Sequence, residues 1–309
     1  MAMQIGQLRA FLAVAEQHHF TRAAKELGLA QPSVSAHVRR LESELETELF
    51  HRMKGNVALT PAGEALLPYA RRIVADVSAA SEELRAVGGL ARGRLAVGAT
   101  PSLSATLLPA VLSRFHSAYP GIELTMREAG SVDLVAALEE GALDIALVIL
   151  PVRHDVLETQ ALVREELVVA VSRQHPLARR RTVAVAELRD VPLVMPRVGY
   201  DLRSATEAAC RAAGFTPTLA VEGGEMDGVL RLAAAGVGAA IVPSLVIERN
   251  GPLHAIRIAR PSLTRTIGLA HRRDRRLSRA AQELTETVRA LVRDRSWLKT
   301  SPPGLTVLR

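Results

Sequence analysis

The chain has 309 residues, a net charge of +7 and an isoelectric point of about 10.4. Apolar residues make up 48% of it and charged residues 23%, which is typical of a globular protein and excludes a disordered one. The single cysteine, Cys210, excludes an internal disulfide and a cysteine-rich metal cage. Charges at Arg9 and Glu16 are unlike a secretory signal, and no apolar run reaches the roughly 18 residues that span a bilayer, so we expect a cytoplasmic protein without a membrane partner.

The positive charge is unevenly distributed. Residues 1–92 carry 11 Lys and Arg against 10 Asp and Glu, and residues 93–269 carry 18 of each. Residues 270–309 carry 10 Lys and Arg against 4 Asp and Glu, and many of these basic residues lie between 272 and 279. A high isoelectric point favours a nucleic-acid partner, but here it does not say where that partner binds.

The first sixty residues have the pattern of a helix-turn-helix. A second short helix, residues 22–27, is predicted to be capped by Thr21 and closed by Gly28, with Ala23 and Ala24 permitting a close helix crossing. His18 and His19 are read as a helix end and a packing residue, because no other ligand lies at metal-binding spacing. A first helix precedes it, with an apolar face of Leu8, Phe11, Leu12 and Ala15.

A third helix is predicted to begin at Pro32, with Val34, Val38, Leu41 and Leu45 as its buried stripe. Its outer half then carries polar side chains that can reach base edges or phosphates. An ordinary three-helix bundle with a solvated polar face is the alternative. The predicted DNA-binding residues are Thr21, Arg22, Gln31, Pro32, Ser33, Ser35, Ala36, His37, Arg39 and Arg40, with Arg52 and Lys54 in a wing.

Residues 61–88 form one long amphipathic helix pattern, introduced by Thr60 as a cap and Pro61 in the first turn. Its apolar residues alternate at spacings of four and three, which is a heptad seam and favours self-association. A helix lying on its own domain is the alternative. The predicted dimerisation residues are Leu66, Ala70, Ile73, Val77, Ala80 and Leu84, and Val87 continues the seam.

From Arg94 onward short apolar β-like runs alternate with helical runs, which predicts an α/β region with mostly parallel strands. Gly88, Gly89 and Gly93 mark its start. Residues 162–166 and 261–266 are the candidate hinge strands between two lobes. The predicted strands begin near residues 95, 122, 143, 167, 193, 219, 237, 255 and 267.

Several segments together resemble the N-terminal signature of LysR-type transcriptional regulators, and the similarity continues through residues 236–243 to about Val292. The matching segments are Leu8 to Glu16, Phe20 to Ala24, Gln31 to Ser35, Leu41-Glu42, Leu49-Phe50 and Leu59 to Gly63. The resemblance implies a winged helix-turn-helix, a dimerising linker helix and a two-lobed α/β effector domain similar to periplasmic solute-binding proteins. It also implies a bacterial regulator that binds promoter DNA as dimers assembling into tetramers, with RNA polymerase as a further partner.

The resulting domain prediction has four parts. Residues 1–60 form the winged helix-turn-helix, 61–89 the linker helix, 90–296 the effector domain and 297–309 a loose tail. Within the effector domain, lobe one comprises about 90–161 and 266–296, and lobe two about 162–265. The arginines of residues 271–279 are expected to begin the last helix as a solvated face, with a contact to DNA backbone or a neighbouring subunit as the alternative.

The effector site is expected where strands run into helix N-termini, because these present unpaired N–H groups. An arginine facing such N-termini suits a small carboxylate or another anion. Ser102 can equally be a helix cap or a ligand contact, whereas Asp201 is expected to be a cap. The predicted effector-binding residues are Thr100, Ser102, Ser131, Val148, Tyr200 and Arg203, with no metal and no other cofactor.

Enzyme signatures are missing from the sequence. There is no phosphate-binding loop ending in Lys-Ser or Lys-Thr, no His-Glu-x-x-His, and no Gly-x-Ser-x-Gly. One branch of the LysR-type family senses peroxide through a pair of cysteines. In this chain Asp201 stands at the position of the reactive cysteine, and only the second cysteine of the pair has a counterpart, Cys210. We therefore expect a transcriptional regulator rather than an enzyme; an enzyme or transport-type binding protein, and a DNA-compacting protein, are the competing classes.

Overall fold

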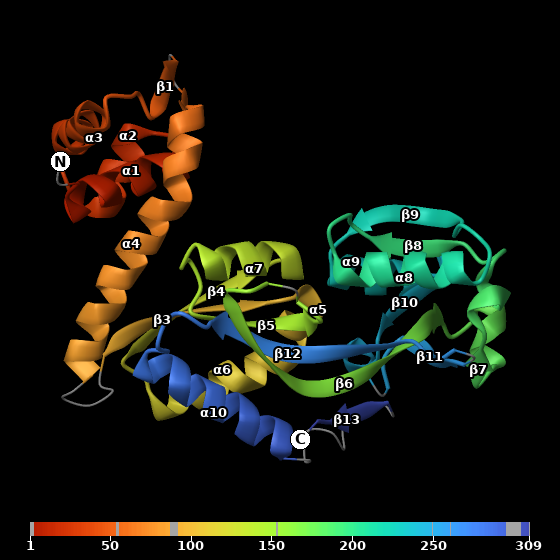
Figure 1. Ribbon diagram of the computed structural model, residues 1–309. Coiled ribbons are helices and arrows are strands. Elements are labelled where there is room, and N and C mark those ends of the chain that lie inside the picture. The colour runs from red at the N-terminus through yellow and green to blue at the C-terminus, as the bar shows by residue number, and fades with distance from the viewer. Residues whose placement is uncertain are drawn as a thin grey trace. The chain divides into compact units, whose positions relative to one another are not determined.

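The computed structural model describes residues 3–53, 56–86, 92–152, 154–248, 250–259, 261–294 and 304–308. The chain divides into two compact units (Figure 1). One comprises Met1–Gly89 with Glu139–Ala142, and the other Leu90–Leu138 with Leu143–Arg309. Each unit has buried apolar cores of its own, so each is described separately.

The first unit has the predicted winged helix-turn-helix order. Three short helices precede a two-stranded antiparallel hairpin, and one long helix follows. The elements are α1 (Ile5–Gln17), α2 (Phe20–Leu27), α3 (Gln31–Leu45), β1 (Phe50–Met53), β2 (Asn56–Leu59) and α4 (Pro61–Ala86).

Local chemistry defines the helix ends. His18 adopts a φ of 50° and ends α1, and the Nδ1 atom of His19 accepts a hydrogen bond from the backbone N–H of Thr21, 3.1 Å away. His19, not Thr21, therefore caps α2, and the predicted cap was wrong by two residues. Gly28 closes α2 at a φ of +65°, as predicted. Helix α3 begins at Gln31, which makes Pro32 its second residue rather than its first.

The core of this unit confirms the predicted apolar faces. Ala23 and Ala24 are buried and let α2 lie close to its neighbours, and the stripe Val34, Val38 and Leu41 of α3 is fully buried. Phe50 anchors the hairpin, because its ring centroid lies 5.3 Å from that of Phe11 and 6.0 Å from that of Phe20.

Helix α4 is introduced by Thr60, whose Oγ1 accepts from the backbone N–H of Gly63 at 3.0 Å. Its predicted seam divides into two parts. Ala70 is fully buried, and Leu66 and Ile73 pack against the core of their own unit. Only the later part of the seam is exposed, with Val77 38% exposed and Ala80 also exposed; the side chain of Leu84 lies outside the described ones.

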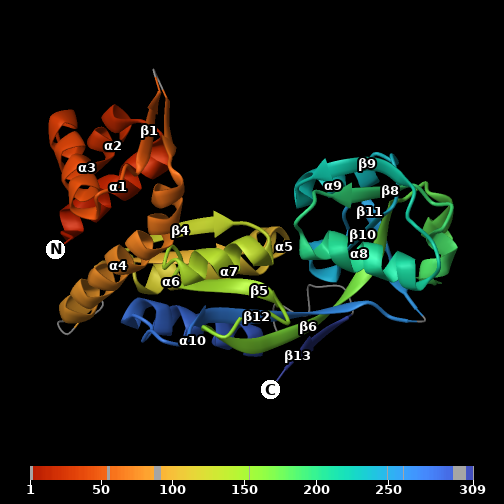
Figure 2. The same ribbon diagram turned by 45° about the horizontal axis from the view of Figure 1, so that its top comes forward.

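Lobe one of the second unit is a sheet flanked by helices (Figures 1 and 2). The strand order is β4-β3-β5-β12-β6, in which β3 runs parallel to β4 and β5, and β12 runs antiparallel to β5 and β6. The elements are β3 (Gly93–Ala99), α5 (Pro101–Ala105), α6 (Leu107–Ala118), β4 (Ile122–Glu128), α7 (Ser131–Glu139), β5 (Ile145–Leu150), β6 (Leu157–Ser172), β12 (Thr264–Arg272) and α10 (Arg279–Arg293).

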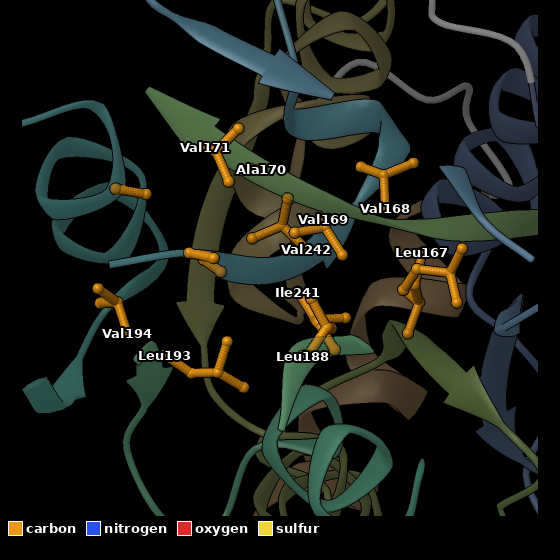
Figure 3. Packing of buried hydrophobic residues seen from close by; sticks show 14 of the residues in the cluster. Leu167, Val168, Val169, Ala170, Val171, Leu188, Leu193, Val194, Ile241 and Val242 are labelled. Carbon is orange, nitrogen blue, oxygen red and sulfur yellow. The ribbon is translucent and has the colours of Figure 1, made fainter. Parts of the chain in front are cut away.

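Lobe two is built on the second half of β6, which pairs antiparallel with β10 and β11. Figure 3 shows its core, where Val169 of β6 lies close to Val242 of β10. The elements are η1 (Pro176–Arg179), β7 (Thr182–Val183), η2 (Val185–Leu188), β8 (Leu193–Pro196), α8 (Asp201–Ala212), β9 (Leu219–Gly224), α9 (Met226–Ala234), β10 (Ala240–Pro243), η3 (Ser244–Val246) and β11 (Leu253–Ile258).

The expectation of mostly parallel strands is wrong for the middle of this unit. Strand β6 runs from one lobe into the other. Its pairings with β10, β11, β12 and the C-terminal strand β13 (Leu305–Val307) are all antiparallel. The chain enters lobe two on β6 and returns to lobe one on β12. The two strands therefore run in opposite directions where they lie side by side, and they pair antiparallel. Residues 162–166, the predicted hinge, lie in β6 where it pairs with β12.

The C-terminal residues also depart from the expectation of a loose tail. Leu305–Val307 form β13, which pairs with Val163–Glu165 of β6, because Leu305 and Val307 can pack against the core of lobe one. The basic cluster lies mostly before the last helix, and its Arg273, Arg276 and Arg279 are exposed, as expected. Helix α10 begins only at Arg279 after its cap Ser278, and Arg272 is buried in an ion pair with Asp274.

Gly63 provides a test of how tightly α4 joins the hairpin. A Cβ atom there would lie 2.2 Å from the carbonyl oxygen of Leu49, whereas one at Gly228 in α9 would meet nothing within 4 Å. We expect Gly63→Ala to destabilise the first unit by about 1–3 kcal/mol through overpacking, although alanine normally favours a helix. Gly228→Ala should raise stability by about 0.4–1 kcal/mol. Calorimetry of the full chain checks both, and equal effects would contradict the close approach.

Candidate DNA-binding surface and interlobe site

The exposed face of α3 carries polar side chains from its first turn onward. Gln31, Pro32, Ser33, Arg39 and Arg40 are all exposed. Thr21 and Arg22 at the start of α2 are exposed as well. The helix therefore presents amide, hydroxyl and guanidinium groups, which can bond to base edges and phosphates.

Three predicted DNA-contact residues on α3 are less exposed than expected. Ser35 is buried; its Oγ accepts from the Nε2 atom of Gln31 at 3.0 Å, and its carbonyl accepts from Nε of Arg39 at 3.3 Å. Ser35 lies on the same side of α3 as these two exposed residues, as predicted, but it is not itself exposed. Ala36 and His37 are half-buried, and His37 lies against Gly6 of α1.

The hairpin is attached to the helices at both of its ends. The Nδ1 atom of His18 lies 3.3 Å from the carbonyl oxygen of Val57, and Val57 donates its N–H to the carbonyl of His18, also at 3.3 Å. Where the hairpin begins, Glu42 accepts from the backbone N–H of Leu49 at 3.0 Å. The wing is thus held beside α2 and α3. Arg52 lies in β1, but its side chain and the whole of Lys54 lie outside the described part of the chain.

In the second unit, the two lobes enclose a small cavity of about 20 Å³. That volume holds about one water molecule and is too small for a metabolite. Of the predicted residues, it brings together Thr100, Ser102 and Tyr200. The full lining is Thr100, Pro101, Ser102, Gly130, Ile149, Tyr200, Asp201, Leu202, Met226 and Arg265.

A buried ion pair lies where the two strands cross between the lobes. Glu165 of β6 is fully buried, and its Oε2 accepts from Nε of Arg265 on β12 at 2.8 Å. Arg265 also donates to Oγ of Ser102 at 2.9 Å, and Glu165 accepts from the backbone N–H of Leu245 at 2.7 Å. These bonds satisfy both charges. The sequence analysis missed both residues, because Glu165 is one of three consecutive charges, Arg164 to Glu166, and the sequence does not show which of them is buried.

Ser131 and Asp201 make a second contact across the cavity. Ser131, the first residue of α7 in lobe one, donates its Oγ–H to Oδ2 of Asp201 at 2.7 Å; its backbone N–H points to the same oxygen at 3.3 Å. Asp201 is the first residue of α8 in lobe two, preceded by Tyr200, whose hydroxyl bonds to Glu225. Burial, followed by that bond to Glu225, raises the pKa of Tyr200.

Comparison with known proteins gives the same division of the chain. Residues 5–64 match the family model of the bacterial regulatory helix-turn-helix protein, lysR family, and residues 88–293 match the LysR substrate binding domain. The chain belongs to the LysR family. It is therefore a LysR-type transcriptional regulator, with a DNA-binding helix-turn-helix and an effector-binding domain, and not an enzyme.

Individual LysR-type relatives cover nearly the whole chain. The transcriptional dual regulator GltC of Bacillus subtilis is 31% identical over 289 residues, which are 93% of this chain and 96% of that protein. A full-length OxyR variant from Pseudomonas aeruginosa has a similar structure, with a TM-score of 0.77 at 25% identity over 98% of this chain and 99% of that one. Full-length CbnR complexed with its target DNA gives a TM-score of 0.68 at 27% identity, over 93% and 99% of the two chains.

Two predicted effector residues of this LysR-type regulator lie away from the cavity. Val148 is fully buried in the core beneath α7, and its neighbour Ile149 lines the cavity, because successive strand residues point to opposite faces. The guanidinium of Arg203 binds Glu207 at 2.7 Å and Glu222 at 2.8 Å. Burial lowers the pKa of Arg203, but its bonds to the two carboxylates outweigh this, so the pKa is raised.

A larger groove of about 340 Å³ lies on lobe one, between the start of β6, β12 and α10. Its polar side chains already bind one another: Arg289 donates to Gln160 and pairs with Glu286, and Glu283 accepts from Tyr119. Unlike the interlobe cavity, this groove is lined by residues of lobe one alone. Within the described residues, no cluster of three metal-binding side chains occurs and no helix is long and apolar enough to cross a membrane.

The buried Glu165–Arg265 pair can be compared with the exposed pair formed by the next residue of β6. We expect Arg265→Met to cost about 3–5 kcal/mol of unfolding free energy, since it leaves Glu165 buried without its cation. Arg257→Met, which removes the partner of Glu166 at a site where Arg257 is 55% exposed, should cost less than about 1 kcal/mol.

Calorimetry of the full chain measures both variants. The double variant Glu165→Gln, Arg265→Met should recover part of the loss, because the remaining amide is neutral and can still accept from Leu245. A cost for Arg265→Met no larger than that for Arg257→Met would show that the pair contributes little.

Proposed function

We propose that this LysR-type regulator reads its promoter by inserting α3 into the DNA major groove. The observation that supports this is the exposed polar face of α3, which carries Gln31, Ser33 and Arg40. Gln31 and Ser33 in the first turn are the groups that can reach base edges, and Arg39, Arg40, Thr21 and Arg22 can hold phosphates. Ser35 contributes indirectly, by fixing the side chains of Gln31 and Arg39.

We propose further that the protein acts as a dimer through the exposed later part of α4. Val77 and Ala80 continue a seam whose earlier residues are already engaged by their own unit. Two helix-turn-helix units then read a two-part DNA site. Tetramers formed from two dimers, a contact with RNA polymerase and a location in the bacterial cytoplasm, where promoter DNA lies, belong to the same proposal.

The effector is proposed to bind between the lobes, at the cavity lined by Thr100, Ser102 and Tyr200. A change in lobe closure would alter the spacing of the dimers and hence the contacts or bend at the promoter. The regulator is proposed to need no metal or other cofactor. A peroxide-sensing disulfide is not part of the proposal, because the chain has one cysteine, Cys210. Cys210 is buried, and burial raises the pKa of its thiol.

The α3 proposal is tested by placing a negative charge at each end of its exposed face. We expect Ser33→Glu with Arg40→Glu to abolish specific binding to the DNA flanking the gene, since the added carboxylates would face base edges and phosphates. Arg179→Glu is the control, because it makes the same charge change as Arg40→Glu on an exposed turn of lobe two, away from α3. It should leave the affinity for DNA unchanged.

Gel shifts at several salt concentrations provide the measurement. Arg40→Glu alone should reduce the salt slope by about 1 if the guanidinium contacts one phosphate. Specific binding retained in the double variant would overturn the assignment of α3 as the recognition helix.

The dimer proposal is tested in the exposed part of the seam. Val77→Glu should convert the dimer to monomers without unfolding the first unit, because that side chain is not part of the described core. Ala79→Glu, about 200° away around the helix from Val77, is the matched control and should leave the dimer intact. Sedimentation velocity distinguishes the species, and equal association states in the two variants would place the interface elsewhere.

A further inference from the structure

The N-terminus of α7 already holds a carboxylate. Helix N-termini attract anions, because their backbone N–H groups are unpaired and the helix dipole is positive there. Oδ2 of Asp201 occupies this position at α7, where it accepts from Oγ of Ser131 at 2.7 Å and lies 3.3 Å from the backbone N. The carboxylate belongs to the opposite lobe, so this contact ties lobe two to lobe one.

The backbone around this contact is shaped for close approach. A Cβ atom on Gly130, directly before α7, would lie 2.6 Å from the carbonyl oxygen of Gly199 and 3.3 Å from Cδ1 of Tyr200. Any larger residue at position 130 would push the lobes apart, because the nearest atom is backbone and cannot turn away. The glycine therefore allows the closed position in which Asp201 reaches Ser131.

The same cavity contains a buried polar atom that is not satisfied. Thr100 is 3% exposed and lines the cavity together with Asp201, and its Oγ1 has no hydrogen-bond partner among the described residues. Buried hydroxyls are nearly always bonded, so this one indicates a ligand group at the site. A second set of donors, at Ser131, is occupied only because Asp201 reaches it.

The nearby cations do not provide an alternative anion site. Arg265 is paired with Glu165, Arg203 with Glu207 and Glu222, and Arg197 with Glu225 at 3.1 Å. A ligand carboxylate entering the cleft would therefore find its most favourable position at the α7 N-terminus. That position is the one taken by Asp201.

We propose that Asp201 is a tethered carboxylate latch: it holds the lobes closed by occupying the anion position of α7, and the effector carries a carboxylate that takes this position from it. This deepens the proposed function, on which it rests, by naming the chemical class of the effector and its point of competition. Asp201 competes intramolecularly, at an effective concentration on the order of millimolar. Effector binding at this position opens the latch, whereas loss of Asp201 leaves the position to a free anion.

The latch is tested by chemical rescue of the full-length protein with formate, in the absence of DNA. Asp201→Ala should show an apparent Tm about 2–5 °C higher in about 100 mM sodium formate than in equal sodium chloride, because formate binds the vacated position in the folded state. The wild type should show no such difference. Asp227→Ala is the matched control, since Asp227 lies in the first turn of α9 in the same lobe and pairs only with Arg231 on the surface.

A second measurement follows closure directly. Hydrogen exchange in residues 129–135 should increase in Asp201→Ala and return towards the wild-type rate in formate. If Asp201→Ala does not fold, Ser131→Ala tests the contact from lobe one and should increase exchange around residues 197–203. An equal formate response in Asp201→Ala, Asp227→Ala and the wild type, or exchange unchanged by Ser131→Ala, would overturn the latch.

These outcomes are independent of the DNA-binding proposal. Retained promoter binding in the Ser33→Glu, Arg40→Glu variant would overturn the recognition helix and leave the formate result standing. Absence of a formate response in Asp201→Ala, with promoter binding behaving as proposed, would overturn the latch alone.

Discussion

The crossing of the chain between two lobes imposes the constraint on which the effector domain depends. Strand β6 enters lobe two and β12 returns from it, and the two strands pair where they cross, with Glu165 opposite Arg265. A buried charge is tolerated only when its partner is held in good geometry, so this pair requires the two strands to keep their register. The sheets of both lobes are built outward from the resulting pair of strands.

The same ion pair connects the crossing to the cleft. Arg265 donates to Ser102 beside α5, and Glu165 accepts from the backbone of Leu245 at the end of lobe two. A change in the angle between the lobes therefore has to preserve these bonds or replace them. On the far side of the cavity the contact of Ser131 with Asp201, allowed by Gly130, connects the lobes. The two sides of the cleft thus differ: one is a permanent crossing, and the other is a contact that a ligand can take over.

The DNA-binding unit follows a simpler logic, and its sequence was correspondingly easier to interpret. The apolar stripe of α3 and the small residues Ala23 and Ala24 are local patterns at helical spacing, and their buried faces were predicted correctly. The errors concern side chains that fold back onto the surface. Ser35 is buried and accepts from Gln31 and Arg39, and the cap of α2 is a histidine, which propensity does not favour. The heptad spacing of α4 was real, but spacing alone cannot distinguish a seam against a second chain from one against its own core.

The kind of protein and the order of a helix-turn-helix, a long helix and an α/β region could be predicted from the sequence, because they depend on motifs within short segments and on the resemblance of these segments to LysR-type regulators. The sequence also indicated Thr100, Ser102 and Tyr200, which follow strands and lie at helix starts. Only the tertiary structure decided that Arg203 is neutralised by Glu207 and Glu222, that Val148 faces the core, and that Asp201 reaches Ser131 seventy residues away. Those outcomes depend on which distant side chains meet, and a local pattern carries no information about the partner that completes a charge or a hydrogen bond.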